Sequence, residues 1–310
     1  MNLFDPQAPY IIAEASGNHA QDRQQARLLV QAAAAAGANA IKYQTFTAEE
    51  ICADVPILFG HDAAHDAWCQ SLGVTRLRQL FAKGGLPRAW HRELQQEARG
   101  QGIEFLSTPF SVDAAKFLVE EVGVPALKIA SGDLTFEPLH QYADSIGLPV
   151  IISTGGATMD EIWGMSEAYG HDVWCNYVAL LHCVSVYPCD QRILNLAALP
   201  VMREHFNVPI GFSDHTLSTD LVPAMAVALG ATIFEKHLRL ATDTSSVDVA
   251  HSLDPEGFTR YVDTIRTCCQ IQGNGIKTPH RLEAHDQLWA RRDPSDWLRP
   301  TQGAREGAWA

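Results

Sequence analysis

The sequence predicts a (β/α)₈ barrel, because eight short apolar runs alternate with eight longer helix-like stretches through most of its 310 residues. Strands that alternate with helices form parallel βαβ units, and parallel strands covered on both faces read as nearly continuous apolar runs. The loop after the first strand reads EASGNHAQ, which lacks the glycine-rich dinucleotide fingerprint of an open, doubly wound sheet. A closed barrel also fits the length, since such barrels commonly form one domain of about 250 residues.

The eight expected strands occupy residues 10–14, 40–44, 103–107, 126–130, 150–153, 178–183, 209–213 and 232–237. The helices expected after them occupy residues 21–36, 87–99, 112–121, 138–145, 159–168, 196–205, 220–229 and 255–271. The first helix is rich in alanine and ends at Gly37, a residue type that favours a helix C-terminus. Pro87 and Pro138 open two other helices, where the first turn tolerates proline.

Two segments fall outside this repeat. Residues 55–86 are long for a βα loop, and such loops within compact domains are usually functional lids or poorly ordered. Residues 273–310 show no hydrophobic periodicity and are too few for a well-packed additional domain. We therefore expect a catalytic barrel over residues 1–272 and a short irregular C-terminal tail over residues 273–310.

The composition argues against several classes of function. The chain carries 23 Lys and Arg against 36 Asp and Glu, a net charge of −13. Phosphate contacts need basic residues and anionic lipids repel acidic chains, so we expect neither nucleic-acid binding nor membrane binding. Seven scattered cysteines without a metal-binding spacing indicate reduced thiols. The N-terminal sequence shows no signal peptide, and we expect a cytoplasmic protein.

Polar side chains gather where the expected strands end, and the active sites of such barrels lie at the C-terminal ends of the strands. These residues are Glu14, Lys42, Gln44, Ser107, Thr108, Lys128, Ser131, Asp133, Ser153, Thr154, His182, Ser185, Tyr187, Ser213, Asp214, His215, Glu235 and His237. Lys42 and Lys128 lie on apolar strands, where a buried lysine needs an anionic partner or loses its proton. Together with the nearby hydroxyl groups, the two lysines predict a pocket for a small phosphorylated carboxylate.

Two histidines predict a metal site. His215 and His237 end adjacent strands, and paired imidazoles with open remaining positions suit a divalent transition metal such as Mn, Fe, Co or Zn. Glu235 lies two residues before His237 and should therefore share its barrel-facing side. Asp248, in the following loop, is either an acid that supports the metal site or a solvated loop residue.

Nine stretches between residues 11 and 258 carry a resemblance to a known family. They are IIAEASGNHA, AGANAIKYQTF, FLSTPFS, ALKIASGDL, PVIISTGGAT, LLHCVSVYP, IGFSDHT, ALGATIFEKHL and HSLDPEGF. With these motifs the chain resembles the sialic acid synthase family, whose members condense phosphoenolpyruvate with an amino sugar. The resemblance implies a (β/α)₈ barrel and, as acceptor, the open-chain aldehyde of an N-acylated, N-acetylmannosamine-like sugar. The implied products are a nonulosonic (sialic-acid-like) acid and phosphate.

The resemblance also implies roles for individual residues. Those that would bind phosphoenolpyruvate are Lys42, Thr108, Lys128, Ser131, Ser153, Ser185 and Ser213. Those that would face the sugar or the reacting water are Glu14, Gln44, Tyr187 and Asp248, and Asp133 and Glu235 would also line the substrate site. His215 and His237 would hold the metal, with Mn²⁺ expected first and Mg²⁺ or Co²⁺ as alternatives. Lys42 and Lys128 would stabilise the phosphate charge, and either Glu14 or Asp248 would orient or deprotonate the water.

The chain departs from the family pattern in several places. Ser16 and Gln21 replace usual glycines, and Asp133 is one methylene shorter than the usual glutamate. Family members usually end in an antifreeze-like domain that reaches across a dimer and offers an arginine to the partner's sugar site, and this chain is too short to contain it. The tail motif WLRPTQGA resembles the motif of that arginine. We expect Arg299 to serve a homodimer in this way from a reduced remnant of the domain, with an unrelated basic tail as the alternative.

Two other functions stay open at this point. One is the same phosphoenolpyruvate chemistry on a different aldehyde, since Asp133 and the missing domain both concern acceptor recognition. The other is a non-catalytic barrel that binds phosphorylated ligands. The presence of both lysines and both histidines argues against this second alternative.

Overall fold

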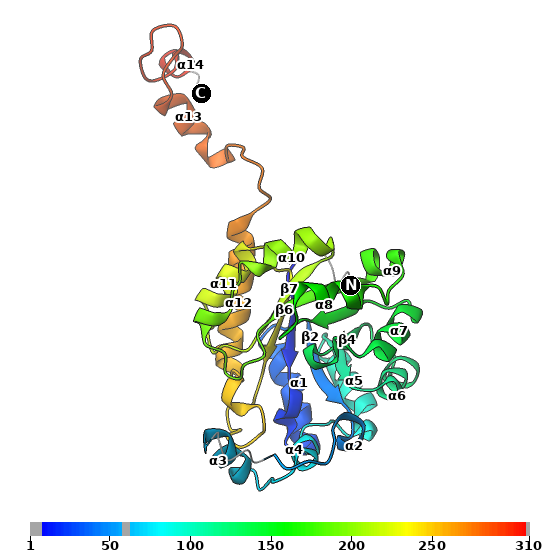
Figure 1. Ribbon diagram of the computed structural model, residues 1–310. Coiled ribbons are helices and arrows are strands. Elements are labelled where there is room, and N and C mark those ends of the chain that lie inside the picture. The colour runs from blue at the N-terminus through cyan, green and yellow to red at the C-terminus, as the bar shows by residue number, and fades with distance from the viewer. Residues whose placement is uncertain (1–7, 58–62, 308–310) are drawn as a thin grey trace. The chain divides into compact units, whose positions relative to one another are not determined.

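The computed structural model describes residues 8–57 and 63–307, and the chain divides into two units, Met1–Ile271 and Gln272–Ala310. Among the described residues of the first unit, parallel strands are hydrogen-bonded in the order β3-β2-β1-β8-β7-β6-β5-β4. β3 and β4, at the two ends of this series, contact one another, so the sheet curls into a nearly closed barrel with helices around it (Figure 1). The predicted (β/α)₈ fold is confirmed.

The strands are β1 (Tyr10–Glu14), β2 (Ala40–Thr45), β3 (Glu104–Pro109), β4 (Leu127–Ile129), β5 (Val150–Ser153), β6 (Val178–Cys183), β7 (Ile210–Asp214) and β8 (Ile233–His237). The helices that follow them are α1 (Arg23–Ala35), α5 (His91–Gly100), α6 (Val112–Lys116), α7 (Glu137–Ser145), α8 (Met159–Ser166), α10 (Ala198–Phe206), α11 (Leu221–Ala228) and α12 (Pro255–Gln272). Each strand and each helix of the repeat lies where the sequence places it.

Additional helices interrupt the simple repeat. α9 (His171–Tyr177) precedes β6, and α2 (Ala48–Ile51), α3 (Ala63–Ser71) and α4 (Leu77–Phe81) lie between β2 and α5. The described part of segment 55–86 has a small core of Ile57, Cys69 and Val74, while residues 58–62 lie outside the described residues. The described part of this segment is therefore folded, with helices and a small core of its own.

The inside of the barrel changes from apolar to polar along the strands. Its apolar filling consists of Tyr10, Ile12, Ala40, Leu106, Ala126, Ile151, Ala179, Leu181 and Ile233. Gly211 belongs to this layer, because a Cβ there would lie 2.3 Å from the Ile233 carbonyl oxygen and 2.5 Å from Leu181 Cδ2. Side chains two apart on a strand share a face. The next inward position after Ala40 is therefore Lys42, and the packed layer forms the floor of the polar end.

The second unit contains α13 (Ala284–Ala290) and α14 (Gln302–Arg305), so the tail is less irregular than the sequence predicts. Asp293 organises it by accepting hydrogen bonds from the backbone N–H groups of Ser295 at 2.9 Å and Gln302 at 2.6 Å. An ion pair joins Arg305 to Asp296. In the parts of the chain that the structure describes, no helix has the length and apolar character that crossing a membrane requires.

Candidate active site

A cavity of about 230 Å³ lies at the C-terminal ends of the barrel strands. The residues singled out from the sequence that line it are Glu14, Lys42, Gln44, Thr108, Lys128, Ser131, Ser153, Ser185, Tyr187, Ser213, His215, Glu235 and His237. Phe110, Ala130, Gly132 and Cys183, which the sequence reasoning did not assign to the site, complete the lining. Every strand contributes at least one residue to these walls. The two lysines and the two histidines therefore meet at one rim of the barrel.

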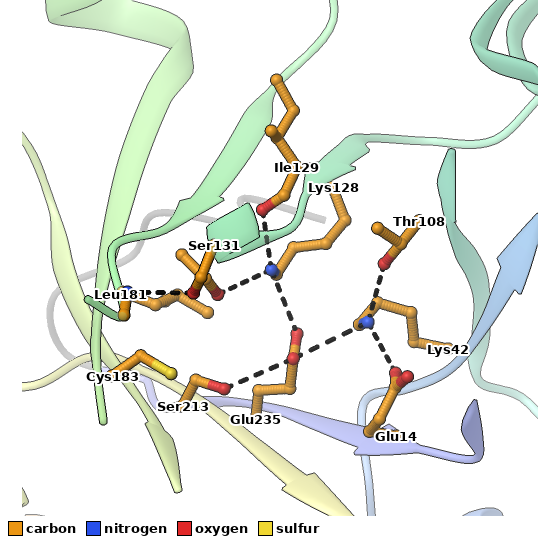
Figure 2. A network of polar contacts seen from close by, with 12 residues as sticks. Glu14, Lys42, Thr108, Lys128, Ile129, Ser131, Leu181, Cys183, Ser213 and Glu235 are labelled. Atoms are coloured by element: carbon orange, nitrogen blue, oxygen red, sulfur yellow. Dashed lines mark hydrogen bonds and ion pairs between the residues drawn. The ribbon is translucent and has the colours of Figure 1, made fainter. Parts of the chain in front are cut away.

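Lys42, on β2, is held by three polar neighbours. Its Nζ lies 2.6 Å from Glu14 Oε2 and donates a hydrogen bond to Thr108 Oγ1 at 2.8 Å (Figure 2). Glu235 Oε1 is 3.6 Å away on the other side. Burial disfavours the charged form, but Glu14 and Glu235 outweigh burial and raise the pKa of Lys42 above its ordinary value. Lys42 is thus a fixed cation in the cavity wall.

Lys128, on β4, is a second lysine of the cavity, and nearby carboxylates balance its buried charge less fully than that of Lys42. Its Nζ donates hydrogen bonds to Ser153 Oγ at 2.7 Å and to the Ile129 carbonyl oxygen at 3.0 Å, while Glu235 Oε2 is 3.9 Å away. Burial lowers the pKa of Lys128, and the attraction of Glu235 offsets this only in part. An anion bound in the cavity would supply the close negative partner that Lys128 lacks.

The two carboxyl groups of the cavity differ in their affinity for protons. Glu235 lies between the lysines and accepts a hydrogen bond from Ser213 Oγ at 3.4 Å. Burial disfavours its charge, but Lys128 and Lys42 together hold the pKa of Glu235 below its ordinary value. Burial raises the pKa of Glu14 to about 7, against the opposing attraction of Lys42. Glu235 therefore favours its charged form, whereas Glu14 can exchange a proton near neutral pH.

Three histidine rings, rather than the expected two, meet beside the lysines. The ring centroids of His215 and His237 are 5.5 Å apart, and that of His251 lies 4.5 Å from that of His237. Hydrogen bonding between His215 Nδ1 and the Val184 carbonyl oxygen at 2.9 Å leaves His215 Nε2 available. His237 Nδ1 is buried and has no hydrogen-bond partner.

The histidines have the chemistry of metal ligands. Burial lowers the pKa of His215, His237 and His251 below the ordinary value. Neutral imidazoles are the form that binds metals. This donor set, with its unsatisfied buried nitrogen, fits a divalent transition metal.

Asp248 lies next to the first cavity but does not line it. It borders an adjoining cavity of about 220 Å³ that shares Gln44, Tyr187 and His237 with the first. Its Oδ2 accepts a hydrogen bond from the Gly17 backbone N–H at 2.9 Å. Of the two alternatives left open by the sequence, the structure thus favours a positioned acid over a solvated loop residue.

Two further predicted residues are not part of the cavity wall. Asp133 follows β4, its Oδ2 is buried without a hydrogen-bond partner, and burial raises its pKa to about 6. Arg299 belongs to the second unit. The predicted roles of both residues in substrate binding stay predictions.

Some polar residues at the strand ends face away from the cavity, contrary to the grouping made from the sequence. His182 lies on the outer face, where its Nε2 is 2.7 Å from the Leu194 carbonyl oxygen and its ring stacks on Phe212. Ser107 likewise bonds outward to Thr45 Oγ1 at 2.7 Å. Both occupy strand positions of the opposite parity to the lining residues, so the pleat directs them toward the helices.

Comparison with known proteins gives consistent matches along most of the chain. The chain matches the NeuB family over residues 29–277. It is 36% identical over 287 residues to N,N′-diacetyllegionaminic acid synthase from Legionella pneumophila, covering 91% of this chain and 78% of that protein. It is 34% identical over 270 residues to pseudaminic acid synthase from Campylobacter jejuni, covering 86% and 75% respectively.

Solved structures show the same likeness. The chain aligns with N-acetylneuraminic acid synthetase from Leptospira borgpetersenii, solved in complex with citrate, with a TM-score of 0.77 and 31% identity. That alignment covers 91% of this chain and 90% of the other. A truncated 3-deoxy-D-arabino-heptulosonate 7-phosphate synthase from Thermotoga maritima aligns over 86% of this chain and 88% of its own, with a TM-score of 0.63 and 16% identity. This last likeness shows a shared fold alone.

Proposed function

Because the chain belongs to the NeuB family, it is an enzyme, and we propose that it condenses phosphoenolpyruvate with the open-chain aldehyde of an N-acylated amino sugar. The products would be a nonulosonic acid and phosphate. The observation that carries this proposal is the cavity in which two buried lysines, two carboxyl groups and a histidine cluster converge.

The lysines suit the donor substrate. Phosphoenolpyruvate carries a phosphate and a carboxylate, so it needs two sources of positive charge in a small space. Lys42 and Lys128 provide them, since both ammonium groups lie within ion-pair distance of the same Glu235 carboxylate. The hydroxyls of Ser153 and Thr108 already bond the two ammonium groups and can hold the donor beside them.

The histidine cluster suits a divalent metal, for which Mn²⁺ is our first choice and Mg²⁺ or Co²⁺ the alternatives. His215 and His237 would hold the ion, because each has an imidazole nitrogen without another partner in the described structure. A metal bound there would act as a Lewis acid that polarises the acceptor aldehyde.

The residues of the cavity account for the remaining steps. The C3 carbon of phosphoenolpyruvate attacks the aldehyde carbon, which leaves positive character at C2. Water adds at C2 and gives a tetrahedral phosphohemiketal. Phosphate leaves when the bond between C2 and the phosphate oxygen breaks, and the oxygen from water stays on C2 as the keto oxygen. Glu14 is our choice for the group that takes the proton from this water, because its pKa of about 7 suits a general base. Lys42 and Lys128 stabilise the phosphate charge throughout.

The acceptor sugar fits the adjoining cavity. Phe46, Trp68 and Phe81 line one part of it, and such aromatic surfaces suit the methyl group of an N-acyl substituent. Asp248 and Gln44 line the same cavity and can hydrogen-bond sugar hydroxyls. This combination supports an N-acetylmannosamine-like acceptor over a small aldehyde.

A phosphate-release assay with phosphoenolpyruvate, Mn²⁺ and a panel of aldehydes tests the proposal. We expect release that requires an N-acylated amino sugar and that matches the formation of a 2-keto acid. Release only with a different aldehyde would move the proposal to that acceptor. A folded protein that binds phosphoenolpyruvate and releases no phosphate with any acceptor would indicate the non-catalytic barrel.

We also propose a cytoplasmic homodimer in which Arg299 of each tail contacts the partner's acceptor. All seven cysteines are free thiols, which suits a reducing compartment. Arg299→Ala should raise the KM for the acceptor and leave the KM for phosphoenolpyruvate unchanged, with Arg281→Ala, an exposed residue of the same tail, as the control. An Arg299→Ala variant with unchanged acceptor KM and kcat would contradict this role.

A further inference from the structure

His251 lies in a position that the sequence reasoning did not single out. It ends a 3₁₀ turn, Val249–His251, that follows β8, and its side chain is buried. Its ring centroid is 4.5 Å from that of His237 and 6.3 Å from that of His215. Imidazoles that share one ion through nitrogens about 2.1 Å from it have centroids on the order of 5 Å apart. The ring of His237 lies at about this distance from each of the other two rings, whereas the rings of His215 and His251 lie farther apart.

Donor atoms of His237 and His251 converge with a carboxylate oxygen of Asp248, and His215 is not a member of this convergent set. One ligand atom each from His237, Asp248 and His251 lies within 4.8 Å of the others. His237 Nδ1 and His251 Nε2 are both buried without a hydrogen-bond partner. Asp248 keeps its Oδ2 on the Gly17 backbone N–H, while its Oδ1 is 3.5 Å from His251 Nε2. Buried polar atoms without partners are rare in folded proteins and call for an explanation.

We propose that His251 is a third imidazole ligand of the metal centre and that Asp248 supplies a carboxylate oxygen beside it. The centre then contains His215, His237 and His251 instead of two histidines. Imidazole ligands suit Zn, Fe and Ni ions, whereas carboxylates and water suit Mn²⁺ and Mg²⁺. The additional histidine should therefore contribute more to the affinity for later transition metals than to the affinity for Mn²⁺.

This inference rests on the proposed function only for the presence of a metal, and metal binding can be measured without turnover. Metal-free protein is titrated with Co²⁺ in competition with a chromogenic chelator, and the visible absorption of the bound Co²⁺ is recorded. The test variant is His251→Phe, which keeps an aromatic ring against Tyr187, whose ring centroid is 4.9 Å from that of His251. The matched control is His182→Phe, on the outer face of the barrel.

We expect His251→Phe to weaken Co²⁺ binding at least about tenfold, since removing even a residue that only orients a ligand has an effect of this size. Its Co²⁺ absorption should change, Mn²⁺ affinity should fall less, and His182→Phe should bind Co²⁺ as the parent does. Unchanged Co²⁺ affinity and spectrum in His251→Phe would overturn the proposal, as would a folded parent protein that binds no metal.

A crystal of the Co²⁺-loaded parent protein provides a second measurement that needs no variant. The anomalous density of the ion should lie within bonding distance of a His251 nitrogen, and a position bonded to His215 and His237 alone would overturn the assignment. The phosphate-release assay is independent of both results. An active enzyme with a two-histidine ion would contradict only this inference, and an inactive protein with a three-histidine ion would contradict only the proposed function.

Discussion

The two faces of the barrel strands carry the same residue types with different surroundings. On the inner face, Lys42 and Lys128 border a cavity and share Glu235. On the outer face, Lys236 is fully buried, lies 3.1 Å from Asp214 Oδ2 and 5.3 Å from the Tyr261 ring centroid. Among the residues that the structure describes, Asp214 is the carboxylate paired with Lys236, and Lys236 lines neither of the two cavities.

Strand parity, more than residue type, therefore decides which buried charges can bind a substrate. Asp214 and Lys236 immediately adjoin His215 and His237 along the chain, yet point toward helix α12 where Tyr261 lies. Their ion pair joins the ends of β7 and β8 on the outer face of the barrel. We therefore expect inner-face substitutions to remove activity and outer-face substitutions to lower stability.

Lys128→Met should produce the largest loss of activity. Removing one preorganised charge that faces the transferring group costs roughly a thousandfold in rate, and of the two cavity lysines Lys128 has the more distant carboxylate, Glu235 Oε2 at 3.9 Å. The kcat/KM for phosphate release measures it. Unchanged circular dichroism would show that the barrel is still folded, and near-normal activity would contradict the assignment.

Lys236→Met, in contrast, should mainly lower the stability of the fold. Breaking a buried ion pair by removing one partner destabilises a protein by about 3–5 kcal/mol, here because the buried Asp214 carboxyl group would lose its partner. Urea denaturation measures the free energy of unfolding. Adding Asp214→Leu to this variant should restore part of the stability, and a single variant as stable as the parent would show that the pair contributes nothing.

His215→Ala should remove the metal and leave the fold intact. We expect the affinity for Mn²⁺ to fall by about a hundredfold, as is common when a metal site is disturbed, with unchanged circular dichroism. Excess EDTA should likewise abolish phosphate release, and added Mn²⁺ should restore it. Full turnover in EDTA would contradict a metal role altogether.

Asp133→Asn should show a smaller, pH-dependent gain in stability. The folded protein raises the pKa of Asp133 from 3.8 to about 6, so the native state binds more protons than the unfolded chain between these values. The stabilisation is complete below pH 4 and is lost as the pH rises through 6. At pH 8 the variant should be more stable than the parent by on the order of 2 kcal/mol. Urea denaturation at pH 4 and pH 8 should show this gain only at the higher value.

The sequence alone was sufficient for much of the barrel and its polar rim. Apolar runs bounded by polar residues placed β5 and β6 at their observed limits, because strands buried on both faces leave a strong hydrophobic signal. The spacing of two residues likewise predicted that Lys42 and Gln44 share a face, as they do.

The features that the sequence did not indicate lie in turns, strand ends and short helices, where the hydrophobic pattern has no clear period. His251 belongs to a single 3₁₀ turn after β8, and its distance from His215 depends on how the barrel brings β7 and β8 together. The position of His182 near a strand end predicts that it belongs to the site. Its side chain lies on the outer face of β6, whereas that of the next residue, Cys183, lines the cavity. Short helices such as α3 and α13 have too few turns for a clear pattern.

Reaction in ¹⁸O-labelled water tests most directly whether the inner-face residues form a phosphoenolpyruvate-condensing site. With phosphoenolpyruvate, Mn²⁺ and an N-acylated amino sugar, we expect acceptor-dependent release of unlabelled phosphate and ¹⁸O at C2 of the new keto acid, read by mass spectrometry before exchange. Label in the phosphate would show that water attacks phosphorus, and release that does not depend on the acceptor would show that no condensation is needed. Either result would contradict a phosphoenolpyruvate-condensing site.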